Sequence, residues 1–233
     1  MRYIFTLLRV STLGLYLSIL ALNLLSALLP SYAMGEQGLP IGAPPAAFGS
    51  SIEEWQERSF SGNTRYEMVN KQGVEVLKAH TQGNASILFR ELPVDVSKTP
   101  LLNWTWMVDR TYGGIEEQSR AGDDFPARLY VVAQTGFLPW ETSAINYVWA
   151  SNAEVGEAWA NPFTDQAIMI AVESGDSCVG KWKSHTRNVA DDFKQHFGKD
   201  IDQLAGYAVM VDGDNAGLEA TAWFGRIEFS AEP

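Results

Sequence analysis

Residues 127–134, ARLYVVAQ, decide the expected fold, because the side chains along this stretch divide cleanly into two sets. Successive side chains of a β-strand point to opposite faces of a sheet. The expected buried set is Leu129, Val131 and Ala133, and the expected outer set is Arg128, Tyr130, Val132 and Gln134. The outer set mixes polar, aromatic and small side chains in place of the Lys and Glu of an ordinary solvated face, so this face is a candidate ligand groove.

The same alternation recurs along two other stretches. Within residues 167–174, the expected inner side chains are Ile168, Ile170 and Val172, and the expected outer ones are Met169, Ala171 and Glu173. Within residues 101–109, one face carries Leu102, Trp104, Trp106 and Val108. We therefore expect these two tryptophans to lie in the core rather than on the surface.

Short runs rich in Val, Ile, Tyr, Trp and Thr recur along the chain, separated by Gly, Pro, Asn and Asp, which is typical of strands and turns. The expected strands are residues 66–70, 74–81, 86–92, 101–109, 128–135, 144–151, 167–174, 204–212 and 221–230. Near 189–197 the pattern predicts one short helix, capped by Asn188 and stopped by Gly198. The prediction is an all-β fold, a two-sheet antiparallel β-sandwich of jelly-roll type.

The first 33 residues predict a signal peptide, because Arg2 and Arg9 precede an apolar run from residue 11 to residue 29. The small residues Ser31 and Ala33 predict cleavage after Ala33. The alternative is an uncleaved membrane anchor. Residues 34–50 are rich in Gly, Pro and Ala and predict a flexible linker, and residues 51–233 predict a single domain. The expected location is periplasmic or secreted.

Charge and cysteine content restrict the partners. Without the two leader arginines, 15 of the 17 basic residues face 28 acidic ones, a formal charge of −13. This charge argues against nucleic acid or an anionic membrane surface and fits a neutral ligand, a cation or a basic protein. Cys178 is the only cysteine, so the fold is held by its core and not by an internal disulfide.

The candidate ligand groove is built from side chains on the expected outer faces. Arg128, Tyr130, Asn146 and Glu173 supply donors, acceptors and a ring for a polyhydroxylated ligand, with Asp123, Asp124 and Arg187 at the rim. The alternative is that loops or the helix cover this face and that Arg128 simply pairs with Glu173.

A second candidate site follows the strand that ends near residue 212. Asp212, Asp214 and Asn215 stand in a glycine turn and offer several oxygens to a hard cation such as calcium. Alternatively, these side chains cap the turn by bonding their own backbone. If the strand continued through Gly213, the two aspartates would share a face about 6 to 7 Å apart, near the spacing of a glycosidase acid pair. No residue is assigned a catalytic role on this basis.

Several strings together resemble a known family. They are residues 123–125 leading into 127–132, then 146–149, then 187–189 with Asp192 and residues 197–198, and finally 212–215. This set, spread over about residues 60–229, resembles the exported bacterial family catalogued as domain of unknown function 3047. The resemblance implies one intact exported domain, and it implies no established catalytic residue.

Three functions remain open from the sequence. The first is a non-catalytic binding module of the cell envelope for a glycan or similar polar ligand. The second is a glycan-active hydrolase or lyase that uses an Asp/Glu pair, for which two carboxyl groups facing each other across a cleft would be the sign. The third is a structural or protein-interaction envelope protein, for which a large exposed apolar patch would be the sign.

Overall fold

The structure is a computed structural model that describes residues 46–136 and 141–232. The expected signal peptide, residues 1–33, and residues 34–45 of the expected linker lie outside the described residues. Within the described ranges, no helix has the length and hydrophobicity needed to cross a membrane.

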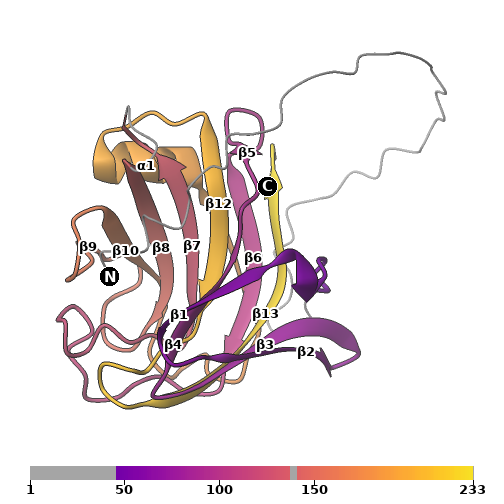
Figure 1. The fold of residues 1–233 in the computed structure, drawn as a ribbon, viewed down its shortest axis with the longest axis vertical. Helices are drawn as coiled ribbons and strands as arrows, with labels where there is room; N and C mark the ends of the chain where they lie inside the picture. The colour runs from indigo at the N-terminus through magenta and orange to yellow at the C-terminus, as the bar shows by residue number, and fades with distance from the viewer. Residues whose placement is uncertain (1–45, 137–140, 233) are drawn as a thin grey trace.

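The described strands form two sheets packed face to face (Figure 1). The larger contains, in spatial order, β1 (Gln56–Ser61), β4 (Ala85–Arg90), β12 (Gln203–Met210), β7 (Arg128–Gln134), β8 (Thr142–Ala150), β10 (Ala167–Ser174) and β9 (Ala158–Ala160), with β5 (Val94–Asp95) paired to β12. The smaller contains β11 (Lys183–Asn188), β6 (Leu101–Val108), β13 (Glu219–Ser230), β3 (Val74–Gln82) and β2 (Arg65–Lys71). The predicted jelly-roll-like sandwich is confirmed. One pair departs from the antiparallel expectation, because β8 and β10 run parallel.

Each of the nine expected strands corresponds to an observed strand, whereas β1, β5, β9 and β11 were not predicted. Their sequences explain this. β1 (QERSFS) and β11 (KSHTRN) are mostly polar, and β5 and β9 are only two and three residues long. Such segments lack the apolar alternation that identifies a half-buried strand. They lie at or near sheet edges, where pairing to one neighbour is enough.

The core between the sheets is built from the predicted inner side chains. Leu129, Val131 and Ala133 of β7 are fully buried there, opposite Trp104 and Trp106 of β6. The Trp104 ring stacks on the ring of Tyr147 in β8 at 5.2 Å and meets the Trp106 ring edge-on at 5.5 Å. Aromatic rings contribute large buried areas, so the expectation that both tryptophans belong to the core is confirmed.

The predicted helix is confirmed as α1 (Val189–Phe197). The Asn188 side chain accepts a hydrogen bond from the backbone N–H of Asp191 at 3.2 Å, and Gly198 ends the helix with a left-handed φ of 65°. Val189 and Phe193 are fully buried in the core. The helix therefore lies against one end of the sandwich (Figure 1).

The folded part includes residues that were expected to belong to the linker. Phe48 is 3% exposed, its ring lies 5.3 Å from that of Trp55, and its backbone N–H donates to the carbonyl of Glu75 at 3.0 Å. The linker boundary predicted at residue 50 therefore lies too far along the chain, because residues 46–50 already pack on the sandwich.

Candidate functional site

The face of the large sheet that points away from the small sheet is called the outer face here. It carries Arg128 and Tyr130 of β7, Asn146 of β8 and Met210 of β12, since these residues pair with one another across the ladder. Arg128, Tyr130 and Asn146 are at most 2% exposed. The structure therefore brings three of the predicted site residues together, in a surface that is more buried than a free groove would be.

At one end of the outer face, Arg128 is held in a buried ion pair. Its Nε donates to Asp212 Oδ1 at 2.8 Å, a second guanidinium nitrogen contacts the other oxygen of the same carboxylate, and a third lies 3.5 Å from Asp123. Neither member of the pair is more than 2% exposed. The alternative expectation that Arg128 pairs with Glu173 is wrong, because the guanidinium contacts Asp212 and Asp123 instead.

Asp123 and Asp124 hold loops together rather than form an exposed rim. Asp123 accepts a hydrogen bond from the Asn161 amide at 3.0 Å. Asp124 accepts from the backbone N–H groups of Asn215 and Ala216, at 3.1 and 2.7 Å. Both carboxyl groups are fully buried, so the predicted rim position is wrong for these two residues.

The predicted metal residues are only partly brought together as ligands. Asp124, Asp212 and Asp214 each present a carboxylate oxygen within 4.8 Å of the others, an arrangement that a cation could use. The Asn215 side-chain amide donates a hydrogen bond to Asp124 at 2.9 Å. Burial raises the pKa of Asp214, and the charge of Asp124 raises it further. Calcium binding stays a prediction.

The surroundings of Asp212 argue against the acid-pair hypothesis, although its carboxyl group lies close to that of Asp214. Asp212 is 2% exposed, it pairs with Arg128, and it also accepts the backbone N–H of Phe125 at 3.1 Å. Burial raises the pKa of Asp212, and the adjacent guanidinium lowers it. Among the described residues, this carboxyl group therefore faces packed protein and not a cleft that a glycan could enter.

Glu173 lies on the opposite side of the sheet from the one predicted. The register between β10 and β8 shifts between Ala171 and Glu173, so Val172 is the extra residue of a β-bulge. Met169 and Ala171 stay on the outer face, while Glu173 turns between the two sheets and binds Lys183 at 3.0 Å. Strict alternation could not reveal this, because one inserted residue reverses the face of all residues that follow.

The remaining predicted residue, Arg187, lies on β11, the strand whose Lys183 binds Glu173 of β10. Arg187 of β11 donates through Nε to Asp192 at 2.9 Å, and Tyr147 donates to the same carboxylate at 2.7 Å. Next to Arg187 on the same face of β11, the His185 ring lies 5.1 Å from the Trp104 ring, and its Nε2 is buried without a hydrogen-bond partner. Arg187 therefore does not join the Arg128 cluster. It links α1 to β11, the edge strand of the small sheet.

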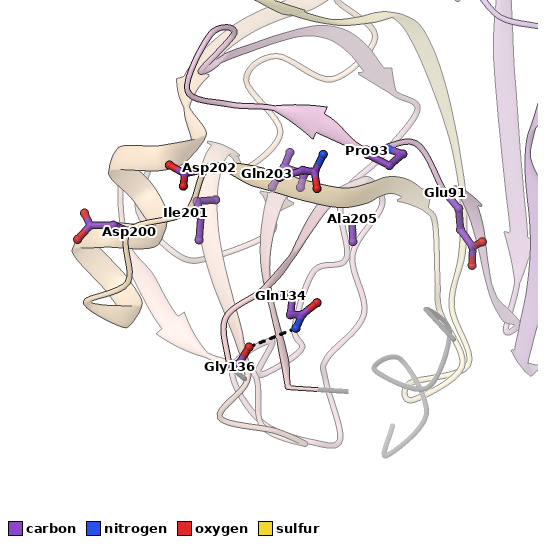
Figure 2. Close-up of a pocket in the computed structure, with 10 residues that line it drawn as sticks. Glu91, Pro93, Gln134, Gly136, Asp200, Ile201, Asp202, Gln203 and Ala205 are labelled. Carbon is purple, nitrogen blue, oxygen red and sulfur yellow. Dashed lines mark hydrogen bonds between the residues drawn. The ribbon is translucent and has the colours of Figure 1, made fainter. Parts of the chain in front are cut away.

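The opposite end of the outer face opens into a pocket. A cavity of about 670 Å³ lies where β7 ends and β12 begins (Figure 2). Its lining residues are Glu91, Pro93, Gln134, Gly136, Asp200, Ile201, Asp202, Gln203, Leu204 and Ala205. The volume is typical of small-ligand sites.

The pocket combines two side-chain amides with carboxylates over a partly apolar lining. Gln134 extends from β7 and donates to the carbonyl of Gly136 at 3.3 Å, and Gln203 stands on the neighbouring strand β12 (Figure 2). Asp200 is bound by Lys194 at 2.6 Å. Sequence reasoning placed Gln134 on the outer face but did not assign it to a site. It missed Gln203, the first residue of β12, and it missed Glu91 and Asp202, which lie in connections between elements. No local pattern encodes how these parts of the chain pack together.

Breaking the buried ion pair from one side is expected to destabilise the protein strongly. Arg128→Met leaves the Asp212 carboxylate buried without its partner, so it is expected to lower the free energy of unfolding by about 3 to 5 kcal/mol. Asp212→Asn is expected to lower it by less, because Asp123 still lies 3.5 Å from the guanidinium. The double variant Arg128→Met/Asp212→Leu is expected to lose much less than the sum. Urea denaturation measures all three.

The control is the exposed pair of Arg226 and Glu228, which is about half exposed on both sides. Arg226→Met is expected to change stability by less than about 1 kcal/mol. Equal losses for Arg128→Met and Arg226→Met would contradict the assigned role of the buried pair.

Acid is expected to lower the stability of the folded protein through His185 of β11. Burial, with the charges of Lys183 and Arg187, lowers the pKa of His185 to about 4, below its usual value of 6.5. Between pH 6.5 and pH 4, His185 therefore binds a proton in the unfolded chain but not in the folded protein. The resulting stability is complete above pH 6.5 and falls by about 1.4 kcal/mol per pH unit down to pH 4.

The measurement compares the free energy of unfolding of the wild type and of His185→Gln between pH 7 and pH 4. The difference between them is expected to shrink or reverse as the pH falls. His196→Gln, on α1, is the control, and a difference that stays constant with pH for His185→Gln would refute the assignment.

Solved structures similar to this chain include three that act on or recognise polysaccharides according to their descriptions. The xyloglucanase domain of NopAA, an effector from Sinorhizobium fredii, is 12% identical, with 82% of this chain and 100% of that chain covered and a TM-score of 0.40. Trichoderma harzianum endoglucanase 3, of family GH12, is 9% identical, with 78% and 100% covered and a TM-score of 0.38. The mannan-recognising carbohydrate-binding module TmCBM27 is 11% identical, with 81% and 95% covered and a TM-score of 0.34.

The search of curated proteins found no match. A family model does match, over residues 53–228, which span nearly the whole described sandwich. This match confirms the resemblance inferred from the sequence strings, and the chain belongs to the family described as "Protein of unknown function (DUF3047)".

Proposed function

We propose that this protein is a non-catalytic binding module of the cell envelope, and that it holds a glycan or a similar polyhydroxylated ligand in the pocket at the Gln134 end of the outer face. The proposal combines the charge and patterning of the sequence with the position of this pocket. This pocket lies apart from the buried Arg128 cluster, whose residues do not line it.

The single observation that carries the proposal is the chemistry of the pocket lining. Gln134 and Gln203 offer amide donors and carbonyl acceptors, while Glu91 and Asp202 offer acceptors only. A sugar hydroxyl both donates and accepts, so a mixed set of this kind matches it. Pro93 and Ile201 add apolar surface for the C–H groups of a sugar ring.

Binding is favoured over hydrolysis by the positions of the carboxyl groups. The pocket carboxylates stand at its two ends, with Glu91 on one side and Asp200 and Asp202 on the other (Figure 2). Asp200 points away from the cavity and is bound by Lys194. A protein-interaction role gains no support either, because among the described residues the exposed large hydrophobic side chains are Leu92 and Val155, which belong to separate loops.

We expect neutral oligosaccharides to bind at the pocket. Gln134→Ala and Gln203→Ala each remove an amide that hydrogen-bonds the ligand, so each is expected to weaken binding by about tenfold, which corresponds to about 1.4 kcal/mol. A glycan array identifies the ligand, and isothermal titration calorimetry measures the affinity of the wild type and the variants.

Gln195→Ala is the matched control, because Gln195 is an exposed residue of α1 that does not line the pocket. Its affinity is expected to equal that of the wild type. If no glycan binds the wild type, or if both pocket variants keep full affinity, the proposed function is wrong.

Export is a separate part of the proposal with its own test. The charged start, the apolar run and the small residues before Met34 favour cleavage after Ala33. Mass spectrometry of the protein isolated from its own host is expected to find Met34 as the first residue, in the periplasmic or secreted fraction. Recovery of the uncleaved chain from the membrane fraction would favour an anchor instead.

A further inference from the structure

Two polar side chains on the outer face are buried without hydrogen-bond partners. Asn146 is 1% exposed and its Oδ1 has no partner, and Thr142 is 2% exposed and its Oγ1 has none. Both belong to β8 and lie four residues apart, so they face the same side of the sheet. Folded proteins rarely leave such atoms unpaired, because burying them without a partner costs free energy.

This row of unpaired atoms continues directly from the pocket. In the ladder between β7 and β8, Thr142 pairs with the pocket residue Gln134, and Asn146 pairs with Tyr130. Four residues of strand separate the two rungs, which is about 13 Å. The surface between them is made of Val132 and small side chains, since Ala144 pairs with Val132 and Ala167 pairs with Ala144.

Phe60 is the described side chain that packs over this surface. It contacts the cluster formed by Ala144 and Ala167, and also the cluster that contains Tyr130 and Met210. Phe60 stands at the irregularity between Ser59 and Ser61 in the edge strand β1, and it is only partly buried. A residue at a bulge in an edge strand is free of the ladder on one side, so its side chain can move without breaking the sheet.

We propose that Thr142 and Asn146 form an inner subsite of the same pocket, which receives the end of a neutral, chain-like ligand when Phe60 moves aside. This inference rests on the proposed function. The carbonyl oxygen of Asn146 accepts a hydrogen bond, so the ligand supplies a hydroxyl or amide donor there. A carboxylate or phosphate group does not fit, because it cannot donate and because Arg128 is already paired with Asp212.

The first experiment measures stability without any ligand. Asn146→Leu removes a buried carbonyl oxygen that has no partner, so the midpoint of thermal unfolding is expected to stay the same or to rise. Asn161→Leu is the matched control, because Asn161 is 5% exposed but its amide is bonded to Asp123 and its carbonyl to the backbone of Phe163. The midpoint of this control is expected to fall. A fall in Asn146→Leu and in the smaller variant Asn146→Ala alike would overturn the subsite.

The second experiment measures affinity, using cellohexaose, xylohexaose and mannohexaose as neutral probes, the corresponding disaccharides, and hexagalacturonate as an anionic probe. The hexaose that binds is expected to bind the wild type at least tenfold more tightly than its disaccharide, and Asn146→Leu is expected to lose that advantage. Hexagalacturonate is expected to bind at least tenfold more weakly than the neutral hexaose.

The outcomes separate the two proposals. If the wild type binds a hexaose through Gln134 and Gln203 but Asn146→Leu keeps full affinity, or if hexagalacturonate binds equally well, the inner subsite is wrong and the proposed function stands. If neither these probes nor any glycan of the array binds the wild type, both are overturned.

Discussion

The buried ion pair between Arg128 and Asp212 is the interaction that determines what the outer face can do. It joins the first residue of β7 to the second residue after β12, and Asp123 and Phe125 attach the preceding loop to the same two charges. Because a buried charge without its partner is so costly, this end of the sheet is fixed and closed. The face can therefore accept a ligand only from its other end, where the chain leaves β7 and enters β12.

Buried polar groups at one end of the outer face have hydrogen-bond partners, whereas two along β8 do not. Around Arg128 the acids accept hydrogen bonds from the guanidinium, from Asn161 or from backbone N–H groups. Along β8, Asn146 and Thr142 keep buried oxygens without a partner. Proteins give up stability in this manner where binding requires it, and residues that serve only the fold are satisfied locally. This contrast separates the polar residues that stabilise the fold from those that we propose bind a ligand.

The fold was largely predictable, because alternation in stretches such as ARLYVVAQ reports directly which side chains meet the core. The site was less so. Glu173 was misplaced by a bulge at Val172 that leaves no mark in the local pattern. Asp123 and Asp124 look like surface acids in the sequence, and only tertiary packing buries them against loops far along the chain. The pocket arises where connections from three separate parts of the chain meet, and periodicity carries no information about such a meeting.

The order of the strands also dictates when the molecule can assemble. β12 lies between β4 and β7 in the large sheet, and β13 lies between β6 and β3 in the small one, so the last thirty or so residues supply a central strand to each layer. Neither sheet can complete its hydrogen-bond ladder before the segment that contains β12 and β13 is available to pair with strands much earlier in the chain. Folding of both sheets therefore depends on pairings between residues far apart in the sequence, which form more slowly than local contacts.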